Sequence, residues 1–260
     1  MLDTLLQATG AYRLYENRLN ALIRKGSIPG HIAIILDGNR RWAQDRNFTV
    51  EMGHAYGADV VENLLDWCHE LGIRSITLYA LSTENLKRSP QEVQELLVLI
   101  EERLRKLLTD ERIYRYRVKV KGIGKLEFLP DSLLATLHEV EQKTASFDGH
   151  FLNIGLAYGG RAEITDVVRS IAEDVKEGKL SPGEIREETI SNRLYTSYLP
   201  NPEPDVIIRT SGEERMSGFL LWQSAYSELI FLDVYLPAFR KIDLLRAVRT
   251  YQKRQRRFGK

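Results

Sequence analysis

The residues best suited to chemistry follow a short apolar run near the start of the chain. That run, residues 32–36, leads directly into five small or polar residues: Asp37, Gly38, Asn39, Arg40 and Arg41. Gly38 permits a tight turn close to a ligand, while the amides opening a following helix and the two arginines favour an anion. Asp37 would repel a phosphate unless Mg²⁺ bridged them, because Mg²⁺ takes one or two carboxylates together with phosphate oxygens. The loop therefore indicates a magnesium-assisted phosphate site, with a plain strand–turn–helix junction as the alternative.

The elements around this loop predict an α/β fold. Six apolar runs with β-branched residues predict strands at residues 31–36, 75–81, 117–121, 150–156, 205–209 and 229–233. Residues 55–71 and 90–108 repeat apolar side chains at spacings of three and four, which predicts helices. The alternation indicates one domain with a mainly parallel sheet of about six strands and helices on both faces. In such a sheet, ligands bind beyond the carboxyl ends of the strands. We place an N-terminal helical segment at 1–28 and the domain at 29–260.

Composition sets limits on the class of protein. The 260 residues are 43% hydrophobic and 28% charged, and the net charge of +1 excludes a chain-wide polyelectrolyte. A single cysteine, Cys68, excludes an internal disulfide and fits a reducing compartment, so we expect a cytoplasmic protein. No apolar run approaches the roughly 20 residues of a membrane span. The charge distribution is uneven only after residue 239. There the sequence has one acidic residue, Asp243, and nine basic residues: Arg240, Lys241, Arg246, Arg249, Lys253, Arg254, Arg256, Arg257 and Lys260.

The phosphate loop and several later blocks resemble the cis-prenyltransferases, also called undecaprenyl or dehydrodolichyl diphosphate synthases, and archaeal-type members in particular. The matching blocks follow in family order at residues 31–43, 53–54, 79–85, 88, 153–161, 205–213, 215–217, 219–223, 226 and 228. This resemblance implies an enzyme that condenses isopentenyl diphosphate onto an allylic starter, geranylgeranyl or farnesyl diphosphate, to give a long-chain polyprenyl diphosphate. It also implies Mg²⁺, a homodimer, an apolar tunnel between helices for the growing chain, and peripheral membrane contact.

The resemblance assigns roles to individual residues. Asp37 and Asn85 would be catalytic: Asp37 holds Mg²⁺, with Glu228 as a second ligand, and Asn85 orients the attacking unit. The allylic diphosphate is assigned to Gly38, Asn39, Arg40 and Arg41, with His54 and Arg88 nearby. Isopentenyl diphosphate is assigned to Arg209, Arg215 and Ser217, and the remaining substrate contacts are Trp42, Ser82, Thr83, Glu84, Leu86 and Met216. A tail of the form Arg-x-Gly, here Arg257 and Gly259, would reach the partner subunit's isopentenyl diphosphate; a patch facing anionic lipid is the alternative.

The chain departs from the family pattern around the starter site. Many members carry arginine where Val50 stands, and bacterial members have glycine at the position of Arg40. Leu81 and Leu86 replace a phenylalanine and a tryptophan of bacterial members. We expect Arg40 to compensate for the charge absent at Val50.

Two other functions compete with the enzyme. A non-catalytic partner subunit of a two-component prenyltransferase would lose the Asp-Gly-Asn loop, which this chain keeps. A nucleic-acid-binding protein would need aromatic residues interleaved with the basic tail, where only Tyr251 and Phe258 are present. We therefore expect no nucleic-acid partner.

Overall fold

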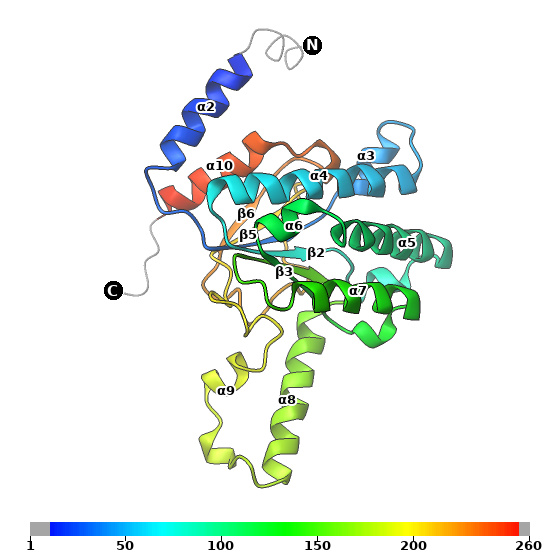
Figure 1. Cartoon of the computed structure of the whole chain (residues 1–260), viewed down its shortest axis with the longest axis vertical. Coiled ribbons are helices and arrows are strands. Elements are labelled where there is room, and N and C mark those ends of the chain that lie inside the picture. The colour runs from blue at the N-terminus through cyan, green and yellow to red at the C-terminus, as the bar shows by residue number, and fades with distance from the viewer. Residues whose placement is uncertain (1–10, 255–260) are drawn as a thin grey trace.

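Six short strands form one parallel sheet in the computed structural model, which describes residues 11–254 (Figure 1). The strands are β1 (His31–Ile35), β2 (Ser75–Tyr79), β3 (Val118–Ile123), β4 (His150–Gly155), β5 (Val206–Arg209) and β6 (Glu228–Phe231). Every residue of β1, β2 and β5 is buried, as expected for strands covered on both faces. The six predicted strands and the α/β class are therefore confirmed, with ends that differ by a few residues.

Nine helices surround the sheet within the described residues. They are α2 (Ala11–Ile23), α3 (Asn39–Gln44), α4 (Val50–Leu71), α5 (Pro90–Leu107), α6 (Glu111–Arg115), α7 (Asp131–Thr144), α8 (Gly160–Lys176), α9 (Glu187–Ser191) and α10 (Lys241–Lys253). Helix α4 begins five residues before the predicted start at residue 55, because the Thr49 side chain caps it by accepting a hydrogen bond from the Met52 amide at 3.3 Å. Helix α5 begins as predicted, with Ser89 as its cap and Pro90 in its first turn.

The two faces of the sheet contact different layers. Side chains such as Ile34 and Ile208 point into the larger core, which also contains residues of α4, α5, α7 and α10. The opposite face packs on buried aromatic residues that include Tyr158 and Phe219. From there α8 leads away to form an arm with α9 (Figure 1). Cys68 is fully buried in the larger core, and its burial raises the pKa of the thiol to about 12.

The strand order places the carboxyl ends of β1 and β5 side by side. The sheet runs β3-β4-β2-β1-β5-β6, so β1 pairs with β2 on one side and with β5 on the other. The chain moves one way from β1 to β2 and later crosses to the other side of β1 to form β5. This reversal is a topological switch point, where a crevice opens beyond the strand ends. The loop at Asp37 lies at this crevice.

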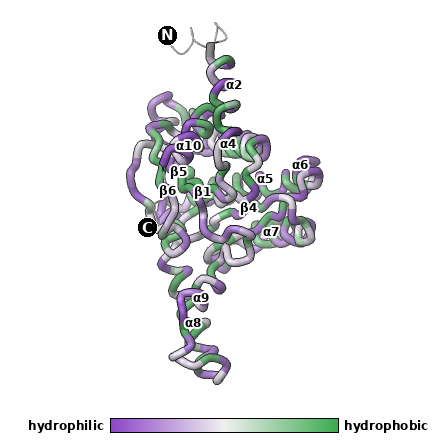
Figure 2. Tube along the Cα trace, turned by 90° about the vertical axis from the view of Figure 1, so that its left-hand side faces the viewer, coloured by the Kyte–Doolittle hydropathy of each residue, from purple (hydrophilic) through white to green (hydrophobic). Residues whose placement is uncertain are grey.

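Helix α2 lies at the edge of the molecule against α10 (Figure 1). Leu19 and Ile23 of α2 are buried in the larger core. In Figure 2 the helix projects from the body and carries both hydrophilic and hydrophobic residues. None of the helices described over residues 11–254 has the length and apolar character needed to cross a membrane.

Candidate active site

The loop after β1 is held by contacts from two other segments. Gly38 has a φ of 101°, and a Cβ at this position would come within 2.7 Å of the Tyr235 ring, so both conformation and space favour glycine. The Thr210 hydroxyl accepts a hydrogen bond from the Asp37 amide at 3.0 Å and donates one to the Asp37 carbonyl at 2.6 Å. The loop backbone is therefore fixed from β5, the neighbouring strand.

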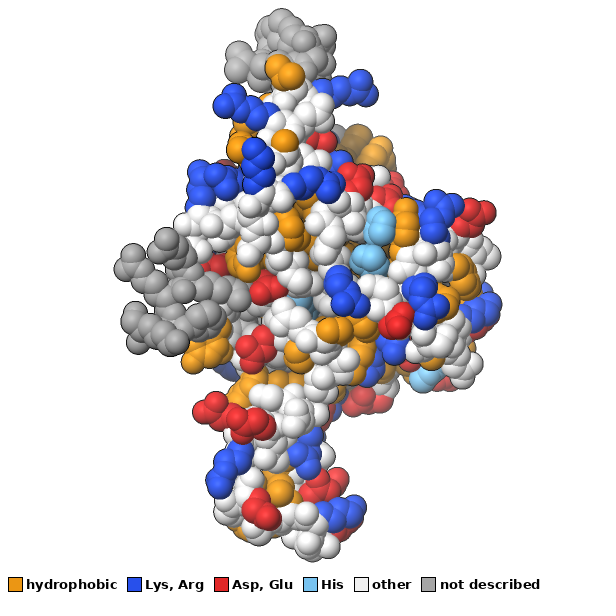
Figure 3. All heavy atoms as spheres, turned by 60° about the vertical axis from the view of Figure 1, so that its left-hand side comes forward, with side chains coloured by type: hydrophobic (Ala, Val, Ile, Leu, Met, Phe, Trp, Pro, Cys, Tyr) orange, Lys and Arg blue, Asp and Glu red, His pale blue; other side chains and the backbone are white. Residues whose placement is uncertain are grey.

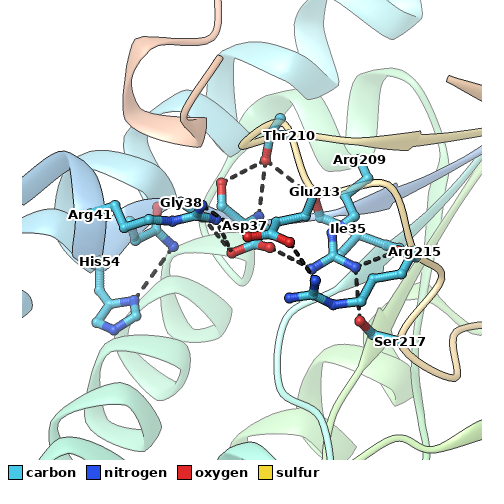
Figure 4. A network of polar contacts seen from close by, with 11 residues as sticks. Ile35, Asp37, Gly38, Arg41, His54, Arg209, Thr210, Glu213, Arg215 and Ser217 are labelled. Carbon is cyan, nitrogen blue, oxygen red and sulfur yellow. Dashed lines mark hydrogen bonds and ion pairs between the residues drawn. The ribbon is translucent and has the colours of Figure 1, made fainter. Parts of the chain in front are cut away.

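The Asp37 carboxylate lies among hydrogen-bond donors (Figure 4). Its Oδ2 accepts from Arg209 Nη2 at 2.6 Å, its Oδ1 accepts from the Gly38 amide at 2.7 Å, and Arg41 Nη2 is 3.7 Å from Oδ1. Burial raises the pKa of Asp37, but the hydrogen bond and charge of Arg209 outweigh it and leave the pKa below its ordinary value. The group is therefore an ionised carboxylate at neutral pH.

A second set of cationic groups adjoins Asp37. The Arg209 side chain is 5% exposed, and its Nη1 donates to Ser217 Oγ at 2.8 Å and to the Arg215 carbonyl. Glu213 accepts a hydrogen bond from Arg215 and one from Arg41, the latter at 3.1 Å. Glu213 thereby connects an arginine of the first loop with one of the second set (Figure 4). Two groups of anion-binding side chains meet on either side of Asp37.

Glu92 organises the other side of the first loop. Its carboxylate accepts from Arg88 Nη1 at 2.8 Å and lies 3.7 Å from Arg40 Nη1 and 3.8 Å from His54 Nε2. Burial and then the charge of Arg88 lower the pKa of His54, and Glu92 opposes them only in part. The imidazole is therefore neutral at neutral pH. We did not predict a role for Glu92 from the sequence.

His54 presents an unused donor to this site. The Asn39 side-chain Nδ2 lies 3.5 Å from His54 Nδ1; in the tautomer in which Nδ1 accepts from it, the imidazole proton is on Nε2. That Nε2 is buried and makes no hydrogen bond within the described part of the chain. The nearest acceptor is the Glu92 carboxylate at 3.8 Å, so a bound anion would compete with Glu92 for this donor.

Asn85 and Ser82 fix each other by reciprocal hydrogen bonds. The Asn85 Oδ1 accepts from the Ser82 amide at 2.9 Å, and the Asn85 amide donates to Ser82 Oγ at 3.1 Å. The side-chain Nδ2 of Asn85 is left as the atom that can donate to a ligand. Thr83 donates to the Glu84 carboxylate at 3.2 Å.

One cavity of about 510 Å³ begins at the Asp37 loop and Asn85 and continues between the sheet and helices α4 and α5. Asp37, Gly38, Asn39, Arg40, Arg41, His54, Asn85 and Arg88 all line it at the carboxyl ends of the strands. Its middle is walled by aliphatic side chains of α4 and α5: Val61, Leu65, Leu96, Leu99, Ile100 and Leu104. Its far end is lined by Asp66, His69, Arg74, Arg112, Tyr116 and His150. His150 begins β4, so the cavity extends along the strands for roughly 16 Å, at about 3.3 Å per residue.

Several predicted site residues lie elsewhere. Trp42 is buried against Phe48 and Tyr56 and does not line the cavity. Leu86 packs on the larger core and Met216 on the smaller one. The contacts of these three side chains therefore support the neighbouring loops. Arg257 and Gly259 lie outside the described residues.

Glu228 is not brought to Asp37 within one chain. It begins β6 and pairs with Val206, at the amino end of the sheet, whereas Asp37 follows the carboxyl end of β1. Its carboxylate forms an ion pair with Arg254 at 2.9 Å. Residues 11–254 contain no group of three or more His, Cys, Asp or Glu side chains that could hold a metal ion.

Asp37 nevertheless fits a Mg²⁺ ion that arrives with a bound diphosphate. Mg²⁺ keeps several waters and is usually held by one or two carboxylates together with substrate phosphates. An ionised carboxylate between two groups of arginines meets this requirement. The site can therefore hold two phosphate groups close together, at the entrance to a largely apolar cavity.

Comparison with known proteins shows which family the chain resembles in sequence and fold. Residues 35–259 match the family model described as "Putative undecaprenyl diphosphate synthase". Proteins of Methanopyrus kandleri and Pyrococcus horikoshii, both named tritrans,polycis-undecaprenyl-diphosphate synthase (geranylgeranyl-diphosphate specific), are similar in sequence. They are 51% and 52% identical to this chain over 96% of its length and over 91% and 94% of their own.

Two solved structures have the same fold. Lavandulyl diphosphate synthase of Lavandula x intermedia, in complex with dimethylallyl diphosphate, superposes with a TM-score of 0.85 at 35% identity, covering 90% of this chain and 99% of that one. A probable undecaprenyl diphosphate synthase of Campylobacter jejuni superposes with a TM-score of 0.72 at 31% identity, covering 90% and 100%.

Proposed function

Because this chain belongs to the undecaprenyl diphosphate synthase family of prenyltransferases, we propose that it condenses isopentenyl diphosphate units onto geranylgeranyl diphosphate, giving a long-chain polyprenyl diphosphate with cis double bonds. The archaeal relatives that are about half identical are named for that starter and for an undecaprenyl product. The observation that carries the proposal is the position of Asp37 between two groups of arginines at the entrance of an apolar cavity. Farnesyl diphosphate is the alternative starter.

The allylic diphosphate occupies the side of the loop that faces α4 and α5. There the amides that begin α3 and the side chains of Arg40, Arg41 and Arg88 donate to its oxygens. The unpaired Nε2–H of His54 is one further donor. Negative charge grows on this diphosphate as its bond to carbon breaks, so donors already fixed in place lower the barrier.

Isopentenyl diphosphate occupies the other side, where Arg209, Arg215 and Ser217 supply donors. Mg²⁺, when bound, stabilises the charge of the leaving diphosphate. Asp37 is the residue that would hold the ion, and its carboxylate then gives up or shares its hydrogen bond with Arg209. Arg209 becomes available to the second substrate at the same time, which couples the two halves of the site.

The proton lost in the condensation leaves near Asn85. The amide of Asn85 is fixed by Ser82 and orients the attacking unit, but an amide is no base. The released diphosphate, held a short distance away by the arginines, accepts the proton.

The growing chain enters the cavity between α4 and α5. Removing one CH₂ from water contributes about 0.8 kcal/mol of favourable free energy. Each five-carbon unit is therefore stabilised by about 4 kcal/mol when it enters the apolar cavity. The same gain holds a long product in the enzyme and makes its release slow. Residues 29–260 form the catalytic domain after an N-terminal helical segment at 1–28, and the enzyme acts in the cytoplasm as a homodimer.

Starter-dependent incorporation of label tests the proposal. Labelled isopentenyl diphosphate should enter an organic-extractable product only when an allylic diphosphate and a divalent metal are present, and excess chelator should abolish incorporation. A non-catalytic partner subunit would incorporate no label under any of these conditions. The retained Asp37 loop argues against that alternative.

A further inference from the structure

The turn at residues 215–218 carries two of the donors that we assign to isopentenyl diphosphate, and its backbone is unusual. Ser217 has a φ of 49° and Gly218 a φ of 78°, so two successive residues lie in the left-handed region. A residue other than glycine adopts this conformation only where its neighbours hold it there. The contacts that hold the turn therefore decide where Arg215 and Ser217 place their donors.

Arg209 and Gly160 each hold part of this turn. The Gly160 amide donates to the Gly218 carbonyl at 2.8 Å and secures the end of the turn. Arg209 Nη1 donates to Ser217 Oγ at 2.8 Å and to the Arg215 carbonyl. Arg209 is itself a donor assigned to isopentenyl diphosphate, so a bound substrate competes for this guanidinium. The contact of Arg209 with Ser217 is therefore weakened when the substrate arrives.

Tyr79 holds the same turn from β2, two strands away from β5. The strand register pairs Tyr79 with Ile35 and Ile35 with Arg209, so these three side chains lie in one row on one face of the sheet. The Tyr79 hydroxyl donates to the Ser217 carbonyl at 3.3 Å and lies equally far from the Tyr158 carbonyl. Burial raises the pKa of Tyr79 above its ordinary value, so the hydroxyl keeps its proton and remains a donor.

The ring of Tyr79 is fixed by aromatic packing. It stacks on the Phe219 ring with the centroids 4.5 Å apart, and it meets the Tyr158 ring edge-on at 5.7 Å. All three side chains are buried in the body of the molecule, from which the arm of α8 and α9 projects (Figure 3). Both acceptors of the hydroxyl are backbone carbonyls. The contact between Tyr79 and Ser217 therefore does not depend on a side chain that binds substrate.

We propose that Tyr79 is a positioning residue for isopentenyl diphosphate. Its hydroxyl fixes the Ser217 carbonyl, and this contact keeps the turn in the left-handed conformation from which Ser217 Oγ and the Arg215 side chain reach the diphosphate. Tyr79 acts through the turn and does not contact the substrate. The identity of the substrate rests on the proposed function, whereas the hold of Tyr79 on the turn does not.

Tyr79→Phe tests this role because it removes the hydroxyl and keeps the stacked ring. Loss of one neutral hydrogen bond should raise the Michaelis constant for isopentenyl diphosphate about two- to tenfold. Turnover and the Michaelis constant for the starter should change by less than about twofold. Calorimetric titration with isopentenyl diphosphate and Mg²⁺, without a starter, should show the same rise in the dissociation constant and does not require turnover.

Tyr195→Phe is the matched control. The Tyr195 ring lies 6.3 Å from the Tyr158 ring, and its hydroxyl donates to the Asp166 carboxylate at 2.9 Å. The change therefore removes a hydroxyl beside the same aromatic residues, but one whose hydrogen bond goes to α8. It should leave the constants for both substrates unchanged. Thermal melting of both variants checks that the fold is kept.

Amide hydrogen exchange tests the hold on the turn without any substrate. The Phe219 amide donates to the Met216 carbonyl at 3.0 Å and so closes the turn. Exchange at residues 215–221 should be about two- to tenfold faster in Tyr79→Phe than in the native protein, and unchanged in Tyr195→Phe. This measurement decides the question even if Tyr79→Phe melts too early for kinetics.

Two patterns would overturn the proposal. Unaltered exchange at the turn together with unaltered binding of isopentenyl diphosphate would show that the hydroxyl does not position Ser217. Equal weakening of both substrates, or a lower melting temperature alone, would give Tyr79 a purely structural role. Failure of the native protein to incorporate label would instead contradict the proposed function, and exchange at the turn would still test the contact between Tyr79 and Ser217.

Discussion

Asp37 and Arg209 join the carboxyl ends of two neighbouring strands through a hydrogen bond of 2.6 Å between Oδ2 and Nη2. Arg209 ends β5 and pairs in register with Ile35 of β1, two residues before Asp37. The strand register therefore sets this contact, although the two residues are far apart in the sequence. In the absence of ligands the carboxylate is paired with the arginine that we assign to isopentenyl diphosphate. A bound substrate and metal must therefore either break the hydrogen bond between Asp37 and Arg209 or bind these two side chains while the bond remains.

Asp37→Ala should lower turnover by at least about 10²-fold, a common cost of removing one electrostatic catalytic group. Turnover is measured as label incorporated at saturating substrates, and circular dichroism checks the fold. Asp45→Ala removes an exposed carboxylate eight residues later and should leave turnover unchanged. An Asp37→Ala variant within a few-fold of the native turnover would reduce Asp37 to a structural cap.

Arg88→Ala should mainly raise the Michaelis constant for the allylic starter, whereas Arg215→Ala should mainly raise that for isopentenyl diphosphate. The reason is that Arg88 lies with Glu92 on one side of Asp37, and Arg215 lies with Glu213 on the other. The two constants are measured separately, each with the other substrate saturating. Parallel effects of both variants on both constants would contradict this division of the arginines.

Arg40→Gly should weaken starter binding about ten- to a hundredfold, since a charge-assisted hydrogen bond contributes about 1.5–3 kcal/mol. Arg40 lies 3.7 Å from the Glu92 carboxylate that also holds Arg88, and we expect it to supply the charge that the family resemblance places at position 50. Val50→Arg alone should have little effect, and adding it to Arg40→Gly should recover much of the loss. Dissociation constants of the starter complete the double-mutant cycle, and additive effects would show that the two positions do not substitute for each other.

His31 should make the protein less stable in mild acid. Burial lowers the pKa of His31 from 6.5 to about 4, and hydrogen bonding to Asn201 and the charge of Asp205 only partly oppose this. Its Nδ1 donates to the Asn201 carbonyl at 2.9 Å, so Nε2 must be the unprotonated acceptor facing Thr77 at 2.8 Å. Protonation would place a second N–H against that hydroxyl.

The sign follows from the lowered pKa. The unfolded chain binds a proton at His31 near pH 6.5, whereas the folded chain binds it only near pH 4. The contribution of neutral His31 to the free energy of unfolding is therefore complete above pH 6.5 and is lost as the pH falls between these values. Between pH 7 and pH 5 the free energy of unfolding should fall by about 2 kcal/mol more in the native protein than in His31→Gln. Urea titrations at the two pH values measure the difference. Identical pH dependence would mean that His31 is not the cause.

Local patterns predicted the fold and the central loop because both depend on neighbours in the sequence. Runs of β-branched residues predicted the six strands, and the apolar run before Asp37 predicted that the strand β1 ends at this loop. The start of α4 was missed because a cap at Thr49, not apolar periodicity, determines where the helix begins. The resemblance to a family then supplied roles that no local pattern contains.

Contacts between distant elements could not be predicted from the sequence. Glu92 and Glu213 matter because helix packing and loop geometry bring arginines from different segments to each carboxylate. Glu228 precedes the predicted strand at 229–233 and so lies at the amino end of the sheet, whereas the resemblance places it with Asp37 as a metal ligand.

Product analysis with a panel of starters tests the central claim most directly. The native protein would receive labelled isopentenyl diphosphate, Mg²⁺ and one of dimethylallyl, geranyl, farnesyl or geranylgeranyl diphosphate, and the dephosphorylated products would be separated by chain length. We predict long-chain polyprenols, formed fastest from geranylgeranyl diphosphate and absent without a starter. No labelled polyprenol with any starter, from protein that is folded and supplied with Mg²⁺, would contradict the account.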